Sequence, residues 1–112
     1  MFTDGGVVME LKGASNAFQA FMQETPEYSR AWLEMVQKLD AANPLDSKTK
    51  ALAYLSVLAA AGLTGGIPFH VQHAKTLGAS REEISGAVLV GLPAVGHAVI
   101  QALPLALAAY DA

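Results

Sequence analysis

The sequence predicts an all-α protein, a compact bundle of about six helices. Apolar residues recur at i, i+3, i+4 and i+7 spacing, and capping residues, prolines or glycines mark the ends of these periodic segments. No segment shows the alternating pattern of a half-buried strand. Residues 1–112 are therefore expected to form a single domain. Within it, residues 1–13 lack periodicity and are expected to form a flexible or subunit-wrapping arm.

The first two helices are expected between residues 15 and 43. Ser15 is a good cap for a short helix that runs to about Glu24. Residues 25–27 (Thr-Pro-Glu) then supply a cap, a proline at the first helical position and an acid in the first turn of a second helix. This helix stops before Asn43-Pro44. Its apolar face consists of Trp32, Met35, Val36 and Leu39.

A third helix is expected to begin at Asp46 or Ser47 and to end at Gly62. It contains many alanines, and alanine-rich faces let neighbouring helices approach closely. A turn at residues 64–66 (Thr-Gly-Gly) leads into a fourth helix, which has Pro68 in its first turn.

Gly78 is expected to end the fourth helix, and residues 80–83 (Ser-Arg-Glu-Glu) are typical of a capping box for a fifth. After a break at Gly91-Leu92, a sixth helix is expected to begin near Pro93. Pro104 should kink that helix.

The composition indicates that apolar surface is buried outside a single subunit. Hydrophobic residues make up 53% of the chain and charged residues 15%. A monomer of this size cannot hide that much apolar surface, so the surplus lies between subunits or in a membrane. Residues 86–110 carry no charge and are long enough to span a bilayer. The prolines, glycines, His97 and Gln101 in that stretch favour a buried helix of a homo-oligomer instead.

Several function classes are excluded by composition. The net charge of −3 leaves no basic patch for nucleic acid. The absence of cysteine excludes disulfides, Fe–S clusters, thiolate zinc sites and a thiol peroxidase cycle. The N-terminus shows no signal-peptide pattern, so we expect a cytoplasmic protein without a membrane partner.

Three segments, at residues 45–56, 62–84 and 91–94, resemble the carboxymuconolactone decarboxylase and alkyl hydroperoxidase D-like superfamily in order and spacing. The redox branch of that superfamily carries the pattern E-x11-C-x-x-C-x3-H. When the pattern is aligned on His70, its cysteine positions fall on Leu63 and Gly66 and its glutamate position on Ala51. The resemblance implies an alkyl hydroperoxidase D-like fold and a trimer or hexamer. Thiol peroxidase activity is not expected, because only the histidine is retained.

His70 is the first candidate catalytic residue. An imidazole with a pKa near neutrality suits general acid or base catalysis on a lactone or β-keto acid. The alternative is a packing residue at a helix junction. The decarboxylase branch has an acid and an arginine just before its histidine, where this chain has Gly66 and Pro68. We therefore expect no cation near His70, and interpret the arginines and lysines as solvated surface residues.

His97 is the second candidate catalytic residue, with His70 or Gln101 as its hydrogen-bond partner or with a backbone carbonyl satisfying it in the core. His73 lies three residues after His70, so the three histidines could in principle hold a metal. However, H-x-x-H alone is a weak pattern and no carboxylate flanks it at ligand spacing. We expect no metal and no cofactor, and an interface or surface role for His73.

The predicted substrate site surrounds His70. Backbone N–H groups of Thr64, Gly65 and Gly66, with Tyr54 or Ser56 from the third helix, are expected to hold an oxyanion. The resemblance then implies a decarboxylase-like lyase that uses cofactor-free acid/base chemistry, decarboxylation or isomerisation, on a small lactone or keto acid. The alternative is a catalytically retired oligomeric scaffold, or a protein that binds an apolar small ligand. A peroxidase or antioxidant role is not supported by the residues.

Overall fold

The computed structural model of the protein describes residues 14–112. Over that range every regular element is a helix, as the sequence predicts. Six α-helices of nine residues or more are joined by turns that include a short helix, α6, and a 3₁₀ turn, η1. The elements are α1 (Asn16–Glu24), α2 (Pro26–Ala42), α3 (Ser47–Ala61), η1 (Thr64–Gly66), α4 (Ile67–Thr76), α5 (Arg81–Leu89), α6 (Leu92–Val95) and α7 (His97–Asp111). The arm expected at residues 1–13 lies outside the described residues.

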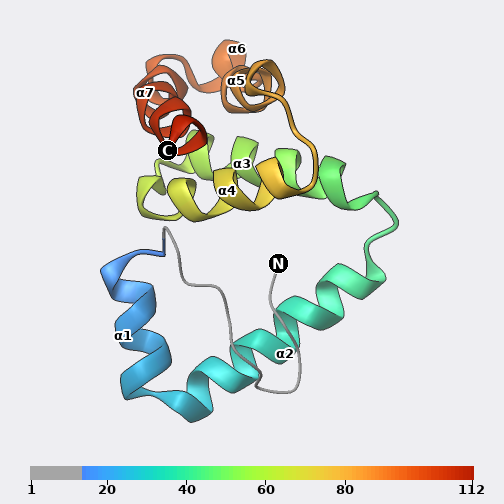
Figure 1. Ribbon diagram of the computed structural model, residues 1–112, viewed down its shortest axis with the longest axis vertical. Coiled ribbons are helices and arrows are strands. Elements are labelled where there is room, and N and C mark those ends of the chain that lie inside the picture. Colours follow the sequence, from blue (N-terminus) through green and yellow to red (C-terminus); the bar gives the residue numbers. More distant parts are fainter. Residues whose placement is uncertain (1–13) are drawn as a thin grey trace.

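The helices form two parts, a bundle of α3 to α7 and a hairpin of α1 and α2 (Figure 1). In the bundle, α3 packs on α4 and α5, and α7 packs across α4 and α5. In the hairpin, α1 packs mainly on α2. The hairpin lies beyond the α3–α4 layer, at the opposite end of the molecule from α5, α6 and α7 (Figure 1).

The hydrophobic core belongs to the bundle. Every fully buried hydrophobic residue lies between Ala51 and Ala106, and among the described residues the hairpin buries only Ser29. Buried alanines at the helix contacts allow close approach, as the alanine-rich third helix predicts. The largest buried side chains are Leu55, Ile67, Ile84, Val71, Val88 and Val99.

Most helix ends are set by the local signals in the sequence. Ser15 and Asp46 each accept a hydrogen bond from the backbone N–H three residues on, at 3.1 and 2.9 Å. Ser80 and Glu83 form the predicted capping box, with bonds of 3.0 and 2.9 Å. Gly62 ends α3 in the left-handed conformation, at φ 71°.

Thr25 departs from the predicted cap of the second helix. It occupies the cap position of α2, but its hydroxyl makes no capping bond there. It donates instead to the carbonyl of Phe21, at 2.7 Å, and so closes the end of α1. The prediction of a Thr25 side-chain cap is therefore wrong, because the tight α1–α2 connection places the preceding carbonyl within reach.

The prediction of one continuous sixth helix from Pro93 is also wrong. The segment is divided into α6 and α7 at Gly96, which has φ 68° and ψ −137°. Only glycine adopts that conformation readily, so the chain turns sharply there. Pro104 lies inside α7, which continues to Asp111. In residues 14–112 we find no helix that combines the length and apolarity needed to cross a bilayer.

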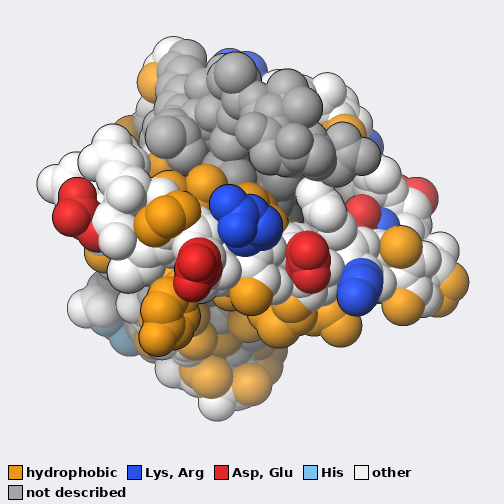
Figure 2. Space-filling view, turned by 90° about the horizontal axis from the view of Figure 1, so that it is seen from below, with side chains coloured by type: hydrophobic (Ala, Val, Ile, Leu, Met, Phe, Trp, Pro, Cys, Tyr) orange, Lys and Arg blue, Asp and Glu red, His pale blue; other side chains and the backbone are white. Residues whose placement is uncertain are grey.

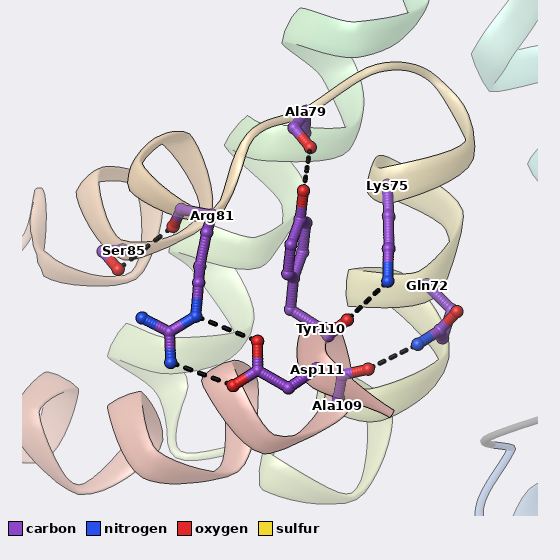
Figure 3. Close-up of polar contacts among 8 residues, drawn as sticks. All are labelled: Gln72, Lys75, Ala79, Arg81, Ser85, Ala109, Tyr110 and Asp111. Carbon is purple, nitrogen blue, oxygen red and sulfur yellow. Dashed lines mark hydrogen bonds and ion pairs between the residues drawn. The ribbon is translucent and has the colours of Figure 1, made fainter.

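Side chains fasten the end of α7 to the rest of the bundle (Figure 3). The hydroxyl of Tyr110 donates to the carbonyl of Ala79 at 3.1 Å, and the carbonyl of Tyr110 accepts from Lys75 of α4 at 2.6 Å. Arg81 and Asp111 form a bidentate ion pair with both N–O distances at 2.9 Å. Of these contacts, the one from Lys75 joins α7 to α4, the helix that carries His70.

Candidate functional site

A pocket of about 570 Å³ lies between the hairpin and the α3–α4 layer of the bundle. Both parts contribute to its wall, which is largely apolar and aromatic. Its walls include Phe18, Trp32 and Met35 from the hairpin and Tyr54, Leu58 and His70 from the bundle. The volume falls in the range of small-molecule sites, which are commonly apolar with a few polar groups.

His70 stands in the wall of this pocket, on the first turn of α4. Its ring lies 4.5 Å from the ring centre of Tyr54 and 5.1 Å from that of Phe69. Gly66 lies close behind it: a Cβ added there would meet the His70 Cδ2 atom at 3.8 Å and Leu58 at 3.6 Å. His70 is thus held by packing against rings and aliphatic carbon.

The ring nitrogens of His70 are accessible. No hydrogen bond joins them to a described residue, and within residues 14–112 no buried side-chain nitrogen or oxygen lacks a partner. A fully buried His70 nitrogen without a partner would be an exception to this finding. The His70 nitrogens that bond to no described residue are therefore open to the pocket or to solvent. The structure therefore presents an imidazole that can meet a ligand.

Burial lowers the pKa of His70 to about 4, and the neighbouring His73 lowers it further. The expected pKa near neutrality is thus corrected. The physical reason is that apolar rings surround the imidazole and disfavour its charged form. At neutral pH, His70 carries one N–H donor and one acceptor nitrogen.

The other predicted site residues divide into two groups. Tyr54 and Gly66 line the pocket beside His70, whereas Ser56, Thr64 and Gly65 do not. The hydroxyl of Ser56 donates to the carbonyls of Leu52 and Ala87, at 3.2 and 2.7 Å, and so joins α3 to α5. Ser56 therefore faces away from His70, into the packing between two helices.

The turn at residues 62–66 uses three of its five backbone N–H groups in hydrogen bonds within the backbone. The N–H groups of Gly62, Leu63 and Gly66 donate to backbone carbonyls of α3 and of the turn itself. Thr64 and Gly65 lie outside the pocket wall. Of the three expected oxyanion donors, the Gly66 N–H is thus already paired, and the other two belong to residues outside the pocket wall.

His97 is exposed and begins α7, beyond the short helix α6. Neither His97 nor any other residue of α7 lines the pocket, which is built from α1, α2, α3, the turn and α4. The structure thus does not bring His97 into the pocket with His70. The break at Gly96 sets this position, because it ends α6 before the histidine.

Lys50 and Asp40 line the pocket, although the sequence interpretation placed all lysines on the solvated surface. The Nζ atom of Lys50 lies 2.7 Å from a carboxylate oxygen of Asp40 and donates to its carbonyl at 3.2 Å. A signal for Lys50 was present in the sequence. It lies four residues before Tyr54 and therefore on the same face of α3.

His73 also lines the pocket, one turn after His70. Burial lowers the pKa of His73, and the charge of Asp40 partly opposes this shift. Over residues 14–112, no three His, Cys, Asp or Glu side chains are grouped so that they could hold a metal ion. The pocket therefore combines two neutral imidazoles with one lysine–aspartate pair.

The sequence matches the family model described as carboxymuconolactone decarboxylase over residues 26–108. The chain belongs to the carboxymuconolactone decarboxylase family. No curated protein and no solved structure matches it significantly. The family match begins before the segments singled out above, so α2 is part of the family domain together with the bundle. This member has Leu63 and Gly66 at the two cysteine positions of the redox motif.

Proposed function

We propose that this carboxymuconolactone decarboxylase family protein performs cofactor-free acid/base chemistry, decarboxylation or isomerisation, on a small lactone or keto acid. The catalytic residue is His70. One observation carries the proposal: an imidazole whose nitrogens bond to no described residue stands in the wall of a largely apolar pocket of about 570 Å³. An accessible polar group in such a pocket is typical of a reaction site.

A neutral imidazole suits reactions that pass through an enolate. Loss of CO₂ from a keto acid, and migration of a double bond in a lactone, both place negative charge on a carbonyl oxygen. The N–H of His70 donates a hydrogen bond that strengthens as this charge develops. The growing negative charge also raises the pKa of the ring, so that His70 becomes a better proton acceptor during the reaction.

Tyr54 and Gly66 complete the proposed substrate site. Tyr54 packs on the His70 ring at 4.5 Å and fixes its orientation. Gly66 lines the pocket beside Leu58 and His70, and a Cβ at that position would contact both. Ser56, Thr64, Gly65 and His97 lie outside the pocket wall, so their predicted roles form no part of this proposal.

The test compares His70→Gln with His97→Gln. Purified protein is incubated in D₂O with a panel of small β-keto acids and lactones, and deuterium incorporation and CO₂ release are followed by NMR. The wild-type protein and His97→Gln should exceed the buffer rate, whereas His70→Gln should lose about 10²-fold or more. No turnover of any compound by the wild type, or an equal loss in His97→Gln, would contradict the proposal.

A second candidate function is non-catalytic binding of an apolar ligand, or a retired scaffold role. The aromatic cluster of the hairpin favours it, because the Phe18 and Trp32 rings meet at 5.4 Å beside the pocket. The donors of the turn at residues 62–66 are also largely used within the backbone. Binding of apolar compounds without deuterium incorporation would support this candidate. A thiol peroxidase role is not proposed, since the chain has no cysteine.

We further propose that the protein is a homo-oligomer, a trimer or a hexamer. Large hydrophobic side chains are exposed on both parts, including Leu39 of the hairpin at 63% and Val90 of the bundle at 66%. Figure 2 shows hydrophobic side chains between charged ones of both signs at the hairpin end. Light scattering that gives a monomer in dilute buffer would contradict this proposal. The cytoplasmic location stays a prediction from the sequence.

A further inference from the structure

Among the described residues, the pocket wall contains one side chain that is positively charged at neutral pH. Lys50 is the one lysine or arginine among the described residues of its wall. Its ammonium group contacts Asp40, which lies near the end of α2 and also lines the pocket. The two histidines of the wall are neutral at neutral pH, because burial lowers the pKa of each. Among the described residues, an anion that enters the pocket therefore meets its positive charge at Lys50.

The two members of this pair differ in their exposure. The side chain of Lys50 is 20% exposed, whereas that of Asp40 is 65% exposed. Asp40 can therefore exchange Lys50 for water at little cost, since its carboxylate is already largely hydrated. Lys50 is the more enclosed partner, so its ammonium group depends more on protein or ligand acceptors.

The ammonium group of Lys50 also has unused hydrogen-bonding capacity. A lysine has three N–H donors. In residues 14–112, its hydrogen bonds go to the carbonyl and the carboxylate of Asp40, at 3.2 and 2.7 Å. One donor thus has no acceptor among the described residues and lies beside a largely apolar cavity. The strongest acceptor for such a donor is a carboxylate, because the bond is then charge-assisted on both sides.

We propose that Lys50 is the anion-binding residue of this pocket, and that its ligand is a small monocarboxylate with an apolar or aromatic body. A second carboxylate would find no cation in the described wall and would be repelled by Asp40. The body of the ligand packs against the aromatic and aliphatic side chains of the hairpin, such as Phe18, Trp32 and Met35.

The catalytic consequence of this inference rests on the proposed function. It distinguishes between decarboxylation and isomerisation, the two reaction types proposed for His70. A carboxylate that is paired with an ammonium group is stabilised before the reaction. That stabilisation is lost if its charge moves away as CO₂ departs. Lys50 therefore favours isomerisation of a keto acid or lactone acid whose carboxylate is retained, over decarboxylation at the carboxylate it holds.

The test uses benzoate and its neutral isostere benzamide as probes. The chain has one tryptophan, Trp32, which lines the pocket, so its fluorescence reports on binding. The wild-type protein should bind benzoate in preference to benzamide. Lys50→Gln should weaken benzoate by about tenfold or more and leave benzamide nearly unchanged. Equal affinity of the wild type for the two probes would overturn the inference.

Asp40→Asn is the matched control, because it breaks the same ion pair but keeps the cation. It should bind benzoate as tightly as the wild type or several-fold more tightly, since a competing carboxylate is removed. If Lys50 only ties the hairpin to the bundle, both variants will weaken both probes alike, and the inference fails. Lys48→Gln should change neither probe, because Lys48 pairs with Glu83 outside the pocket.

His70→Gln distinguishes this inference from the proposed function. It should abolish deuterium incorporation without a comparable loss of benzoate affinity. Benzoate binding that depends on Lys50 in a protein without turnover would refute the proposed function and support the inference. Turnover whose KM for carboxylate substrates is unchanged in Lys50→Gln would refute the inference and support the function.

Discussion

The bundle of α3 to α7 and the hairpin of α1 and α2 are both helical, yet only the bundle encloses its large apolar side chains. Leu55, Ile67 and Ile84 are fully enclosed in the bundle. The apolar side chains of the hairpin stay partly or largely exposed, with Phe18, Phe21 and Trp32 clustered against one another. Apolar helix residues therefore form a packed core in one part and a pocket wall in the other.

The two parts also differ in what joins them to their neighbours. The bundle is closed by side-chain bonds at the end of α7 (Figure 3). In the described chain, the Lys50–Asp40 pair is the one hydrogen-bonded link between the hairpin and the bundle. We therefore expect the free energy of unfolding to depend mainly on the bundle, and access to the pocket to depend on the hairpin.

The largest effect is expected from a cavity in the bundle core. Leu55 is fully buried, so Leu55→Ala should reduce the free energy of unfolding by about 2–5 kcal/mol. Leu39→Ala in the hairpin should change it by about 0.5 kcal/mol or less, because Leu39 is largely exposed. Urea denaturation followed by circular dichroism measures both. A similar loss in the two variants would show that a partner covers the hairpin in solution.

The next effect is a dependence of stability on pH that originates in the pocket. The pKa of His70 is about 4 in the folded protein and about 6.5 when it is exposed. Between these values the unfolded chain binds more protons, so stability rises with pH and is complete above pH 6.5. It is lost as the pH falls towards 4, by at most about 3 kcal/mol.

His70→Gln should flatten the dependence on pH between 6.5 and 4.5, above the range where the carboxylates titrate. His97→Gln serves as the control, because it replaces an exposed histidine that lies outside the pocket. Some slope from His73 should persist in both variants, since its pKa is lowered in the same direction. An unchanged slope in His70→Gln would show that the ring is more hydrated than its packing indicates.

A smaller effect is expected at the glycines on either side of the turn into α4. Gly62 has φ 71°, so Gly62→Ala should reduce the free energy of unfolding by about 1–2 kcal/mol. Gly66 has φ −89°, and a Cβ there would make ordinary contacts. Gly66→Ala should therefore be neutral or slightly stabilising. Thermal unfolding compares the two, and an equal loss would mean that Gly66 needs its space for packing.

The smallest effect on stability is expected from the link between the two parts. Lys50→Gln should cost less than about 1 kcal/mol, because its partner is largely exposed. Its consequence should be local: amide hydrogen exchange should accelerate in α2 and remain unchanged in α5 and α7. Exchange that accelerates equally in all three helices would show that the hairpin and the bundle unfold together.

The helix ends could be predicted because their signals are local. Ser15, Asp46, Gly62 and the Ser80–Glu83 capping box act over three or four residues of chain, so the sequence alone specifies them. Whether one helix or two follow Gly91 was harder to predict from the sequence. It depends on Gly96 adopting a backbone conformation that its neighbours permit but do not require.

The all-α class, the family, the absence of thiol chemistry and the position of His70 at the start of a helix follow from the sequence. The surroundings of His70 depend on how separate helices pack against one another. The hairpin places Asp40 against Lys50, the break at Gly96 keeps His97 outside the pocket, and a hydrogen bond to α5 turns Ser56 away from it. The physical reason is range: caps act through neighbouring atoms, whereas a pocket and its pKa values depend on side chains from separate helices.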